Sequence, residues 1–394
     1  MTAMRRVYFD HNATTPVDKE VLEAMLRYFS TEYGNASSIH SFGQETRAAV
    51  ERARSSVAAL LGAKPSEIVF TSGGTESDNL AIFGIVEGAP GPRKHIITTQ
   101  IEHSAALNSC QALANRGIDV TFLPVGPEGV LDASEVKRAI RPETVLITVM
   151  HANNEIGTLQ PLEEIGRIAA EADVWFHADA VQSAGKIPLD VEKLGVDLIS
   201  ISAHKFYGPK GVGALFVRSG TKLEPVFHGG HHERDRRPGT ENVPGIVGLG
   251  RAAELAKEKL SGDAAHVTRL RDRFERGVLA SVPGARVNGA GAARVPNTSN
   301  ISFPEVASEA LLIALDLKGL ACSSGSACSS GAVTPSHVLT AIGLCAADAR
   351  ASLRFSLGRH TTEAEVDYVL AMLPVEVARL RAISPEKKKV APIT

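Results

Sequence analysis

The sequence has few cysteines, few aromatic residues, almost no net charge and no long hydrophobic run. Four cysteines in 394 residues are too few and too scattered for a disulfide framework. A net charge of −2 offers no electrostatic field for nucleic acid or anionic lipid, so we expect no direct nucleic-acid binding. No stretch approaches the roughly 20 apolar residues that a membrane helix needs. Small molecules and other proteins remain as the expected partners.

The N-terminal segment, MTAMRRVYFDHNATTP, carries two arginines but no apolar stretch behind them. It therefore resembles neither a signal peptide nor a transit peptide, and we expect a cytoplasmic protein. At 394 residues the chain exceeds the length at which a single hydrophobic core usually stops growing. A large domain with a smaller second one is the expected organisation.

Short apolar runs rich in β-branched residues alternate with helix-length segments from about residue 65 to 217. The runs that predict strands are 67–70, 95–99, 119–125, 144–150, 174–179, 197–202 and 211–218. This alternation predicts an α/β fold with a mainly parallel, seven-stranded sheet and helices on both faces.

A different pattern follows residue 245. A long helical stretch at about 246–279 precedes a short strand at 300–303, a helix at 308–318 and a strand at 352–358. This order indicates a smaller C-terminal α+β domain. The predicted divisions are an N-terminal segment packing on the small domain (1–15), a large domain (16–258) and a small domain (259–394).

Polar residues follow four of the predicted strands at their carboxyl ends. The four stretches are TSGGTE (71–76), HANNE (151–155), DAVQ (179–182) and AHK (203–205). In open α/β sheets, ligands bind outside the carboxyl ends of the strands, so we expect these stretches to converge on one crevice.

Lys205 and Asp179 are the residues of this set with the most specific chemistry. If Lys205 points into the crevice, burial lowers the pKa of its amine and makes it able to hold a carbonyl as a Schiff base. A surface lysine on a Gly-Pro turn is the alternative. Asp179 ends an apolar strand and needs either a cationic partner, such as a protonated pyridine nitrogen, or a helix to cap. A lysine Schiff base with an aspartate on a pyridinium nitrogen is how proteins bind pyridoxal phosphate.

A phosphate would fit the strand-to-helix turn that contains Gly74 and Thr75. Backbone N–H groups at the start of a helix bind phosphate, although a Gly-Gly-Thr sequence is more often only a turn. Ser202 and His204 flank Lys205 and are within reach of the same phosphate.

Three further side chains suit a planar ring. His103 is positioned to stack on such a ring or to move protons, although a capping or core role is the simpler interpretation of a lone histidine. Gln182 and Asn154 are able to donate hydrogen bonds to a ring oxygen or to a substrate.

The motifs together resemble those of cysteine desulfurases of the NifS/IscS type, which are fold-type I, class V aminotransferase-like enzymes that use pyridoxal 5′-phosphate. The matching stretches, in order, are DHNATTP (10–16), YGNASSIH (33–40), FTSGGTESDN (70–79), EHSA (102–105), HANNEIG (151–157), HADAVQ (177–182), SAHKFYGPKG (202–211), RPGTENV (237–243), GSACSSG (325–331) and RFSLGR (354–359). The resemblance implies conversion of L-cysteine to L-alanine, with the sulfur passing through an enzyme-bound persulfide to iron–sulfur cluster assembly or related sulfur transfer.

The resemblance also implies a role for each site residue. The cofactor ring would be held by Lys205, Asp179, His103, Gln182 and Asn154. The phosphate would be held by Gly74, Thr75, Ser202 and His204 and, from the partner subunit of a homodimer, by Thr240. The substrate would be bound by Asn35, Asn154 and Arg354, with the arginine taking the carboxylate in a bidentate pair. Lys205, His103 and Cys328 would be the catalytic residues.

Cys322 and Cys328 lie six residues apart in LACSSGSACSSG (320–331), a run of small, uncharged residues. Half of a metal site, a disulfide and a thiol on a mobile arm are the three interpretations. No second Cys or His pair lies nearby at ligand spacing, so we expect no metal. The resemblance implies that Cys328 is the nucleophile, on a mobile loop at about 321–333. For Cys110, Cys322 and Cys345 we expect roles as small core residues.

Two other functions remain open from the sequence. One is a lyase of the same fold that acts mainly on selenocysteine or cysteine sulfinate. The other is a catalytically weak subunit that serves as a binding platform in a sulfur-transfer assembly. The sulfur acceptor is also open, because iron–sulfur scaffold assembly, nitrogenase maturation and tRNA thiolation all draw on this chemistry.

Overall fold

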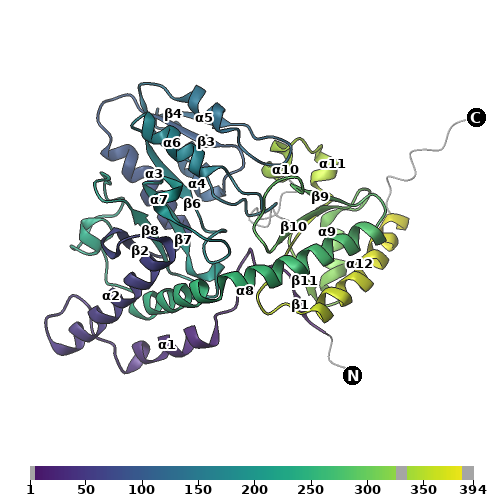
Figure 1. The fold of residues 1–394 in the computed structure, drawn as a ribbon, viewed down its shortest axis with the longest axis horizontal. Helices are drawn as coiled ribbons and strands as arrows, with labels where there is room; N and C mark the ends of the chain where they lie inside the picture. Colours follow the sequence, from purple (N-terminus) through teal and green to yellow (C-terminus); the bar gives the residue numbers. More distant parts are fainter. Residues whose placement is uncertain (1–4, 325–334, 384–394) are drawn as a thin grey trace, which may run out of the picture.

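The computed structural model describes residues 5–324 and 335–383. Its larger part is built around a seven-stranded sheet, and its smaller part contains a three-stranded and a two-stranded sheet (Figure 1). The strands of the large sheet are β2 (Ile68–Thr71), β3 (His95–Thr99), β4 (Asp119–Leu123), β5 (Thr144–Thr148), β6 (Trp175–Asp179), β7 (Leu198–Ser202) and β8 (Gly213–Val217). Each of them lies within one residue of a strand predicted from the sequence at both ends, except that β4 and β5 end two residues earlier and β8 begins two residues later.

The large sheet is mainly parallel, which confirms the predicted fold class. Its spatial order is β2-β8-β7-β6-β5-β3-β4. β8 runs antiparallel to both of its neighbours, and the other pairings are parallel. β2 therefore points in the same direction as β7. As a result, the carboxyl ends of β2, β3, β5, β6 and β7 lie at the same edge of the sheet.

Helices cover both faces of this sheet. They are α1 (Lys19–Ser30), α2 (Ser41–Leu61), α3 (Gly74–Gly88), α4 (Ser104–Ala114), α5 (Ala133–Ala139), α6 (Leu162–Glu171), α7 (Val191–Leu194) and the first half of α8 (Val243–Ser281), with single turns η1 (Pro65–Glu67), η2 (Ala203–Lys205) and η3 (Glu233–Asp235). Successive strand residues point to opposite faces. Ile147 and Ile199 pack in a core with α2, α6 and α8, whereas Leu146 and Leu198 pack in another with α3 and α4.

α8 crosses from the large part of the molecule to the small part (Figure 1). Its side chains up to Ala256 belong to the core of the large sheet, and those from Val267 onward belong to a second core. Val7 and Phe9, near the N-terminus, also lie in this second core. The predicted boundaries near residues 15 and 259 agree with this change of core and stay predictions. None of the helices in the described residues is both long and apolar enough to cross a membrane.

The small part contains the predicted strands and helices together with several very short elements. Its elements are β1 (Val7–Tyr8), β9 (Arg286–Asn288), β10 (Thr298–Ser302), α9 (Ser308–Asp316), β11 (Leu320–Ala321), α10 (His337–Ala341), α11 (Ala346–Ala349), β12 (Ser352–Ser356) and α12 (Glu363–Ile383). β1 pairs in parallel with β11, and β10 lies between β9 and β12 in an antiparallel sheet. The elements that the sequence did not predict, such as β1 and β11, are too short to give a periodic pattern.

The close packing of α2 on α8 gives a prediction for stability. A Cβ at Gly250 would lie 2.6 Å from both the Cα and the Cβ of Ala53, whereas a Cβ at Gly262 of the same helix would meet nothing within 4 Å. We expect Gly250→Ala to lower the free energy of unfolding by about 1–3 kcal/mol through overpacking. Gly262→Ala should raise it by about 0.5–1 kcal/mol through helix propensity. Urea unfolding measures both, and shifts of the same sign would contradict this account of the helix contact.

Candidate active site

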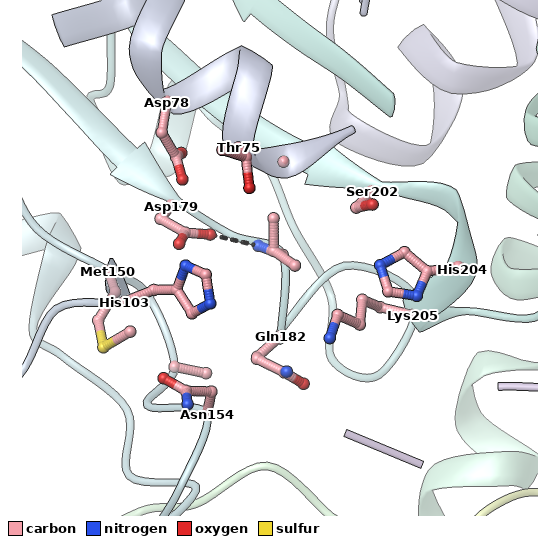
Figure 2. Close-up of a pocket in the computed structure, with 13 residues that line it drawn as sticks. Thr75, Asp78, His103, Met150, Asn154, Asp179, Gln182, Ser202, His204 and Lys205 are labelled. Atoms are coloured by element: carbon pink, nitrogen blue, oxygen red, sulfur yellow. Dashed lines mark hydrogen bonds between the residues drawn. The ribbon is translucent and has the colours of Figure 1, made fainter. Parts of the chain in front are cut away.

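A cavity of about 220 Å³ opens at the carboxyl ends of β2, β5, β6 and β7 (Figure 2). The predicted site residues that line it are Gly74, Thr75, His103, Asn154, Asp179, Gln182, Ser202, His204 and Lys205. Asp78, Met150, Ala152 and Val181 line it as well and were not predicted. The four polar stretches singled out in the sequence therefore meet in one crevice.

The N-terminus of α3 forms one wall of this cavity. Gly73 precedes the helix, and no side chain in the described part of the chain caps it. A Cβ on Gly213 of β8 would lie 2.7 Å from the Cα of Gly73, so the turn is pressed against the neighbouring strand. The side chains of Thr75 and Ser202 lie on the same side of the cavity (Figure 2). Free backbone N–H groups at a helix start, with hydroxyls beside them, suit an anion such as a phosphate.

Two buried carboxyl groups, Asp179 and Asp78, lie at another wall. Asp179 ends β6 and accepts a hydrogen bond from the backbone N–H of Val181 at 2.9 Å. Burial raises the pKa of both groups. The charge of Asp179 raises the pKa of Asp78 further, whereas His103 and Lys205 oppose the rise at Asp179. Asp179 is thus the better placed of the two to carry a negative charge, and a cationic ring nitrogen beside it would stabilise that charge.

His103 caps α4 and lines the cavity at the same time. Its Nδ1 accepts a hydrogen bond from the backbone N–H of Ala105 at 3.2 Å. Burial lowers the pKa of His103, Asp179 raises it, and the positive charges of Lys205 and His337 lower it. Because Nδ1 is an acceptor, the neutral ring carries its proton on Nε2. The capping role that a lone histidine suggested is present, and stacking on a ring stays a prediction.

Lys205 lies in η2, immediately after β7, and lines the cavity, so it is not a surface lysine. Its Nζ donates hydrogen bonds to the backbone oxygens of Asn12 at 2.6 Å and Ala13 at 2.9 Å. Next to it, Nδ1 of His204 lies 3.1 Å from Oγ1 of Thr14. Burial, with the charge of Lys205, lowers the pKa of His204 to about 4. His204 is therefore neutral at pH 7 and offers hydrogen bonding without adding charge.

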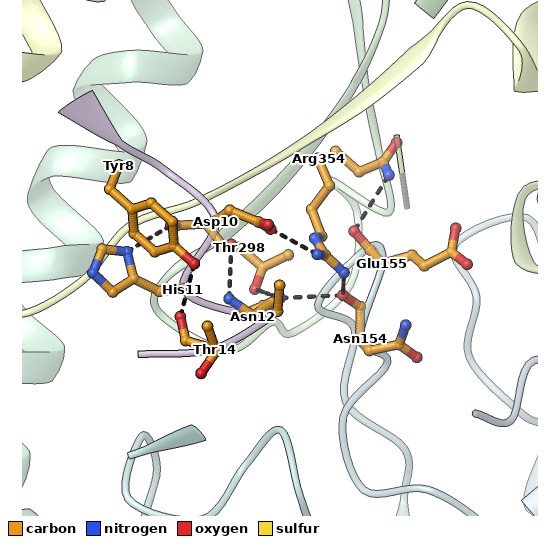
Figure 3. Close-up of polar contacts among 12 residues, drawn as sticks. Tyr8, Asp10, His11, Asn12, Thr14, Asn154, Glu155, Thr298 and Arg354 are labelled. Carbon is orange, nitrogen blue, oxygen red and sulfur yellow. Dashed lines mark hydrogen bonds and ion pairs between the residues drawn. The ribbon is translucent and has the colours of Figure 1, made fainter. Parts of the chain in front are cut away.

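Arg354, on β12, connects the small part of the molecule to Asn154 at the cavity (Figure 3). Its Nη1 donates to the backbone oxygen of Asn154 at 3.0 Å, and its Nη2 donates to Oδ1 of Asp10 at 2.8 Å. Nε of Arg354 and Oδ1 of Asn154 are buried without a hydrogen-bond partner among the described residues. A buried donor and a buried acceptor left unpaired are costly, and a ligand with a carboxylate and an amine would pair both. A bidentate bond to a carboxylate would require Arg354 to exchange Asp10 for that ligand.

Asn35 and Thr240 do not line the cavity of their own chain. Oδ1 of Asn35 accepts from the backbone N–H of Ser37 at 2.9 Å, in the loop between α1 and α2 at the edge of the molecule (Figure 1). Thr240 is exposed, which is compatible with its predicted action at the partner subunit's site. The roles of both residues stay predictions.

Cys328 lies outside the described residues. The chain before it passes Arg354, because the backbones of Ser323 and Arg354 exchange hydrogen bonds of 3.1 and 2.6 Å. Cys322 is partly buried against the second core, and burial raises its pKa. Cys110 is fully buried, which confirms its predicted core role. The core role predicted for Cys345 is wrong, because this residue is exposed and caps α11.

Sequence reasoning gave no role to Asp10, Asn12, Asp78 and Lys186. Asp10 and Asn12 belong to DHNATTP, a run of polar residues that directly follows the apolar segment at residues 7–9. Lys186 follows Gln182 by four residues in an otherwise apolar and small-residue stretch, SAGKIP. A charged or amide side chain within or next to an apolar stretch was the sequence signal that could have pointed to these residues.

Glu102 gives a prediction about pH. It is buried beside His103, its Oε1 accepts from the hydroxyl of Thr99 at 2.6 Å, and burial raises its pKa from 4.5 to about 8. Folding therefore takes up a proton at Glu102 between these pH values, and the contribution of this group to the free energy of unfolding falls through this window by about 1.4 kcal/mol per pH unit. The stability of Glu102→Gln relative to wild type should rise from pH 5 to pH 8 and then level off. Urea unfolding at fixed pH measures this, and a difference independent of pH would contradict a protonated Glu102.

Comparison with known proteins agrees with this geometry. The family model for class-V aminotransferases matches residues 7–369. A cysteine desulfurase IscS from Dictyoglomus turgidum is 50% identical over 385 residues, covering 98% of each chain. One from Anaeromyxobacter dehalogenans is 53% identical over 382 residues, covering 96% of this chain and 94% of that protein.

Solved structures give the same answer. A NifS-like protein aligns with a TM-score of 0.89 and 41% identity, covering 95% of this chain and 100% of its own. A structure described as SspA in complex with cysteine aligns with a TM-score of 0.80 and 41% identity, covering 90% and 99%. The chain therefore belongs to the class-V aminotransferase family and, within it, to the cysteine desulfurases of the NifS/IscS type.

Proposed function

We propose that the protein is a pyridoxal-phosphate-dependent cysteine desulfurase that converts L-cysteine to L-alanine and receives the sulfur as a persulfide on Cys328. The observation that carries this proposal is the convergence of Lys205, Asp179 and the uncapped start of α3 on one cavity. An amine, a buried carboxylate and a phosphate-binding turn are each common alone. Their combination in a chain of this family supports one cofactor.

Pyridoxal 5′-phosphate fits the groups around the cavity. When bound, it supplies an electron sink for the pair released by breaking a bond at the Cα of an amino acid. Lys205 would hold its carbonyl carbon, Asp179 would face its ring nitrogen, and the start of α3 would hold its phosphate. The stacking of His103, the hydrogen bond from Gln182 and the phosphate contacts of Thr75, Ser202 and His204 belong to the same proposal.

The substrate proposed is L-cysteine, bound by Arg354 and Asn154. Its carboxylate and amine match the unpaired Nε and Oδ1 of these two residues. The relative named SspA was solved with cysteine, which supports the same substrate class. Asn35 is proposed to help with the carboxylate.

The chain's own residues then divide the chemistry between them. Lys205 removes the Cα proton as a base, with neutral His103 beside it to hold or pass a proton. The Cys328 thiolate forms a bond to the substrate sulfur while the Cβ–S bond breaks, and Cβ takes up a proton. L-cysteine and the Cys328 thiol thus give L-alanine and the Cys328 persulfide. An iron–sulfur scaffold or a related acceptor protein would take the sulfur, and the cytoplasmic location stays a prediction.

The test compares two variants with the wild type. The purified, cofactor-loaded wild type should release equal amounts of L-alanine and sulfide from L-cysteine in the presence of a thiol reductant. Cys328→Ser should keep the visible absorption of the bound cofactor and lose sulfide release by more than about 100-fold, because serine is not a sulfur acceptor. Lys205→Ala should lose both the absorption and turnover. Cys322→Ser, the same chemical change at the neighbouring cysteine, should retain both.

The rival functions give different results in this assay. If Cys328→Ser turned over L-cysteine at the rate of the wild type, the assignment of Cys328 as the nucleophile would be contradicted. The relative rates on selenocysteine and cysteine sulfinate would then identify the lyase. A wild-type protein without bound cofactor or turnover would favour the binding platform.

We further propose a homodimer in which Thr240 of one subunit reaches the phosphate of the other. Leu22, Leu26 and Phe29 are spaced along one face of α1 and are 48%, 55% and 63% exposed. Tyr33, Ile39 and Phe42 are exposed directly after them. Soluble monomers rarely expose apolar side chains in such a group, so a second copy is the expected cover.

The segment that leads to Thr240 is firmly attached to the phosphate side of the sheet. Glu233 is buried and accepts two hydrogen bonds of 2.8 Å from Arg54, although its φ of 45° lies in the left-handed region. A residue held in such strain is normally fixed by its surroundings. Arg237 pairs at 2.8 Å with Glu76, the residue after Thr75. A fixed, exposed loop of this kind is suited to contact with a second subunit.

The dimer is tested by placing a charge on α1. Phe29→Glu should convert the protein from dimer to monomer at micromolar concentration, because a buried unpaired carboxylate is costly, and should weaken cofactor binding through the loss of the partner's Thr240. Leu279→Glu, at a residue of α8 that is 46% exposed in the small part, is the control and should remain dimeric. Sedimentation velocity measures both, and a dimeric Phe29→Glu would contradict this interface.

A further inference from the structure

A second lysine, Lys186, lies behind Lys205 and takes no part in the chemistry described above. Its Nζ donates to Oε1 of Gln182 at 2.7 Å and to Oδ1 of Asn12 at 3.1 Å. Both partners are neutral amides rather than carboxylates. Lys186 and Lys205 together line a smaller cavity of about 40 Å³ next to the first. Burying a lysine without a carboxylate partner costs free energy. Such a position therefore suggests that the hydrogen bonds of Lys186 have a role in the site.

The contacts of Gln182 fix the direction in which its amide faces. Its Oε1 accepts from Lys186, and its Nε2 donates to the backbone oxygen of Asn12 at 3.0 Å. Turning the amide by 180° would put Oε1 against that backbone oxygen, with no proton between two acceptors. In the observed orientation, the second N–H of Nε2 is left for the cavity that Gln182 lines.

Asn12 connects Lys186 and Gln182 to the rest of the site, and Figure 3 shows Asn12 beside Asn154 and Arg354. Asn12 is 1% exposed. Its backbone oxygen, which accepts from Gln182, also accepts from Lys205 at 2.6 Å. Its Nδ2 donates to the backbone oxygen of Asn154 at 3.1 Å. Lys186 therefore contacts a residue, Asn12, that is bonded to Lys205, Gln182 and Asn154 at once.

The charge of Lys186 does not explain its position. Burial, followed by the positive charges of Lys205 and Arg354, lowers its pKa well below the usual range. A salt bridge would have raised that pKa instead. The amine of Lys186 therefore contributes to the site as a hydrogen-bond donor to Oε1 of Gln182 and Oδ1 of Asn12.

We infer that Lys186 is a positioning residue that holds the Gln182 amide so that an N–H, rather than the carbonyl oxygen, faces the ring oxygen of the cofactor. The inference rests on the proposed function, because it takes that ring oxygen as the partner of Gln182. Gln182 is the residue that touches the cofactor, and Lys186 acts through it. Without Lys186 the amide loses the donor that fixes its oxygen.

The experiment uses Lys186→Met, which removes the donors and keeps most of the side-chain volume. In the holoenzyme, we expect the visible absorption band of the bound cofactor to change as it does in Gln182→Ala. We expect kcat to fall about tenfold, the effect of losing one oriented hydrogen bond. Lys94→Met is the matched control, because Lys94 donates to the backbone oxygen of Val86 at the far end of α3 from the cavity. It should leave the band and kcat unchanged.

A double variant separates positioning from a general effect on folding. In Lys186→Met/Gln182→Ala, the absorption band and kcat should equal those of Gln182→Ala alone, because the inference has Lys186 act through Gln182 and not through its bond to Asn12. Losses that add in the double variant, or an unchanged band in Lys186→Met, would overturn the inference. Should Lys186→Met fail to fold, Lys186→Leu, which also lacks a hydrogen-bond donor, replaces it and the same comparison decides.

The wild-type protein tests the proposed function, and the Lys186→Met variant tests the inference. A wild-type protein that binds no pyridoxal phosphate would overturn both the proposed function and this inference. A wild type that binds the cofactor and releases L-alanine, beside a Lys186→Met variant with an unchanged band, would overturn the inference alone.

Discussion

The parallel pairing of β5, β6 and β7 is the constraint on which the rest of the site depends. Because these strands point the same way, Asp179 and Ser202 end neighbouring strands at one edge of the sheet, and Lys205 follows within one turn. The side chains on both faces are mostly apolar and are covered by helices, with a few buried polar exceptions such as His177 and Ser200. A cavity between buried strands and the uncapped start of α3 is the result.

The N-terminal segment completes this edge from the other side. Asp10 pairs with Arg354 of the small part, while Asn12 bonds Lys205 and Gln182 of the large part. The same few residues thus connect the groups proposed for the substrate with those proposed for the cofactor. A movement of the small part relative to the sheet would act on Lys205 through this segment, because both bind it directly.

Much of this arrangement was predictable from the sequence, and the remainder depends on contacts between distant residues. Strands such as β3 gave strong local signals because a continuous β-branched run predicts a buried strand, and the polar residues after β6 and β7 followed from the edge rule. The antiparallel direction of β8 had no local signal. Asn12 was missed because its partners Lys205, Gln182 and Asn154 lie far from it in the sequence. Lys186 was missed because its partners are amide side chains, and no sequence motif marks such a pair. Cys345 was predicted wrongly because cysteine is usually buried, whereas its thiol accepts a backbone N–H at the start of α11.

Three buried carboxyl groups at or near the cavity, Asp78, Glu102 and Asp179, differ in the charges that surround them. His177 lies 3.7 Å from Oδ1 of Asp78, but burial lowers the pKa of His177 to about 3, so it offers no positive charge. Burial, together with the negative charge of Asp179, raises the pKa of Asp78 and that of Glu102, the latter to about 8. Asp179 alone has His103 and Lys205 to favour its ionised form. Of the three, Asp179 is therefore the carboxyl group that a cationic ring nitrogen in the cavity would complement best, because the positive charges of its neighbours already oppose the effect of burial on its pKa.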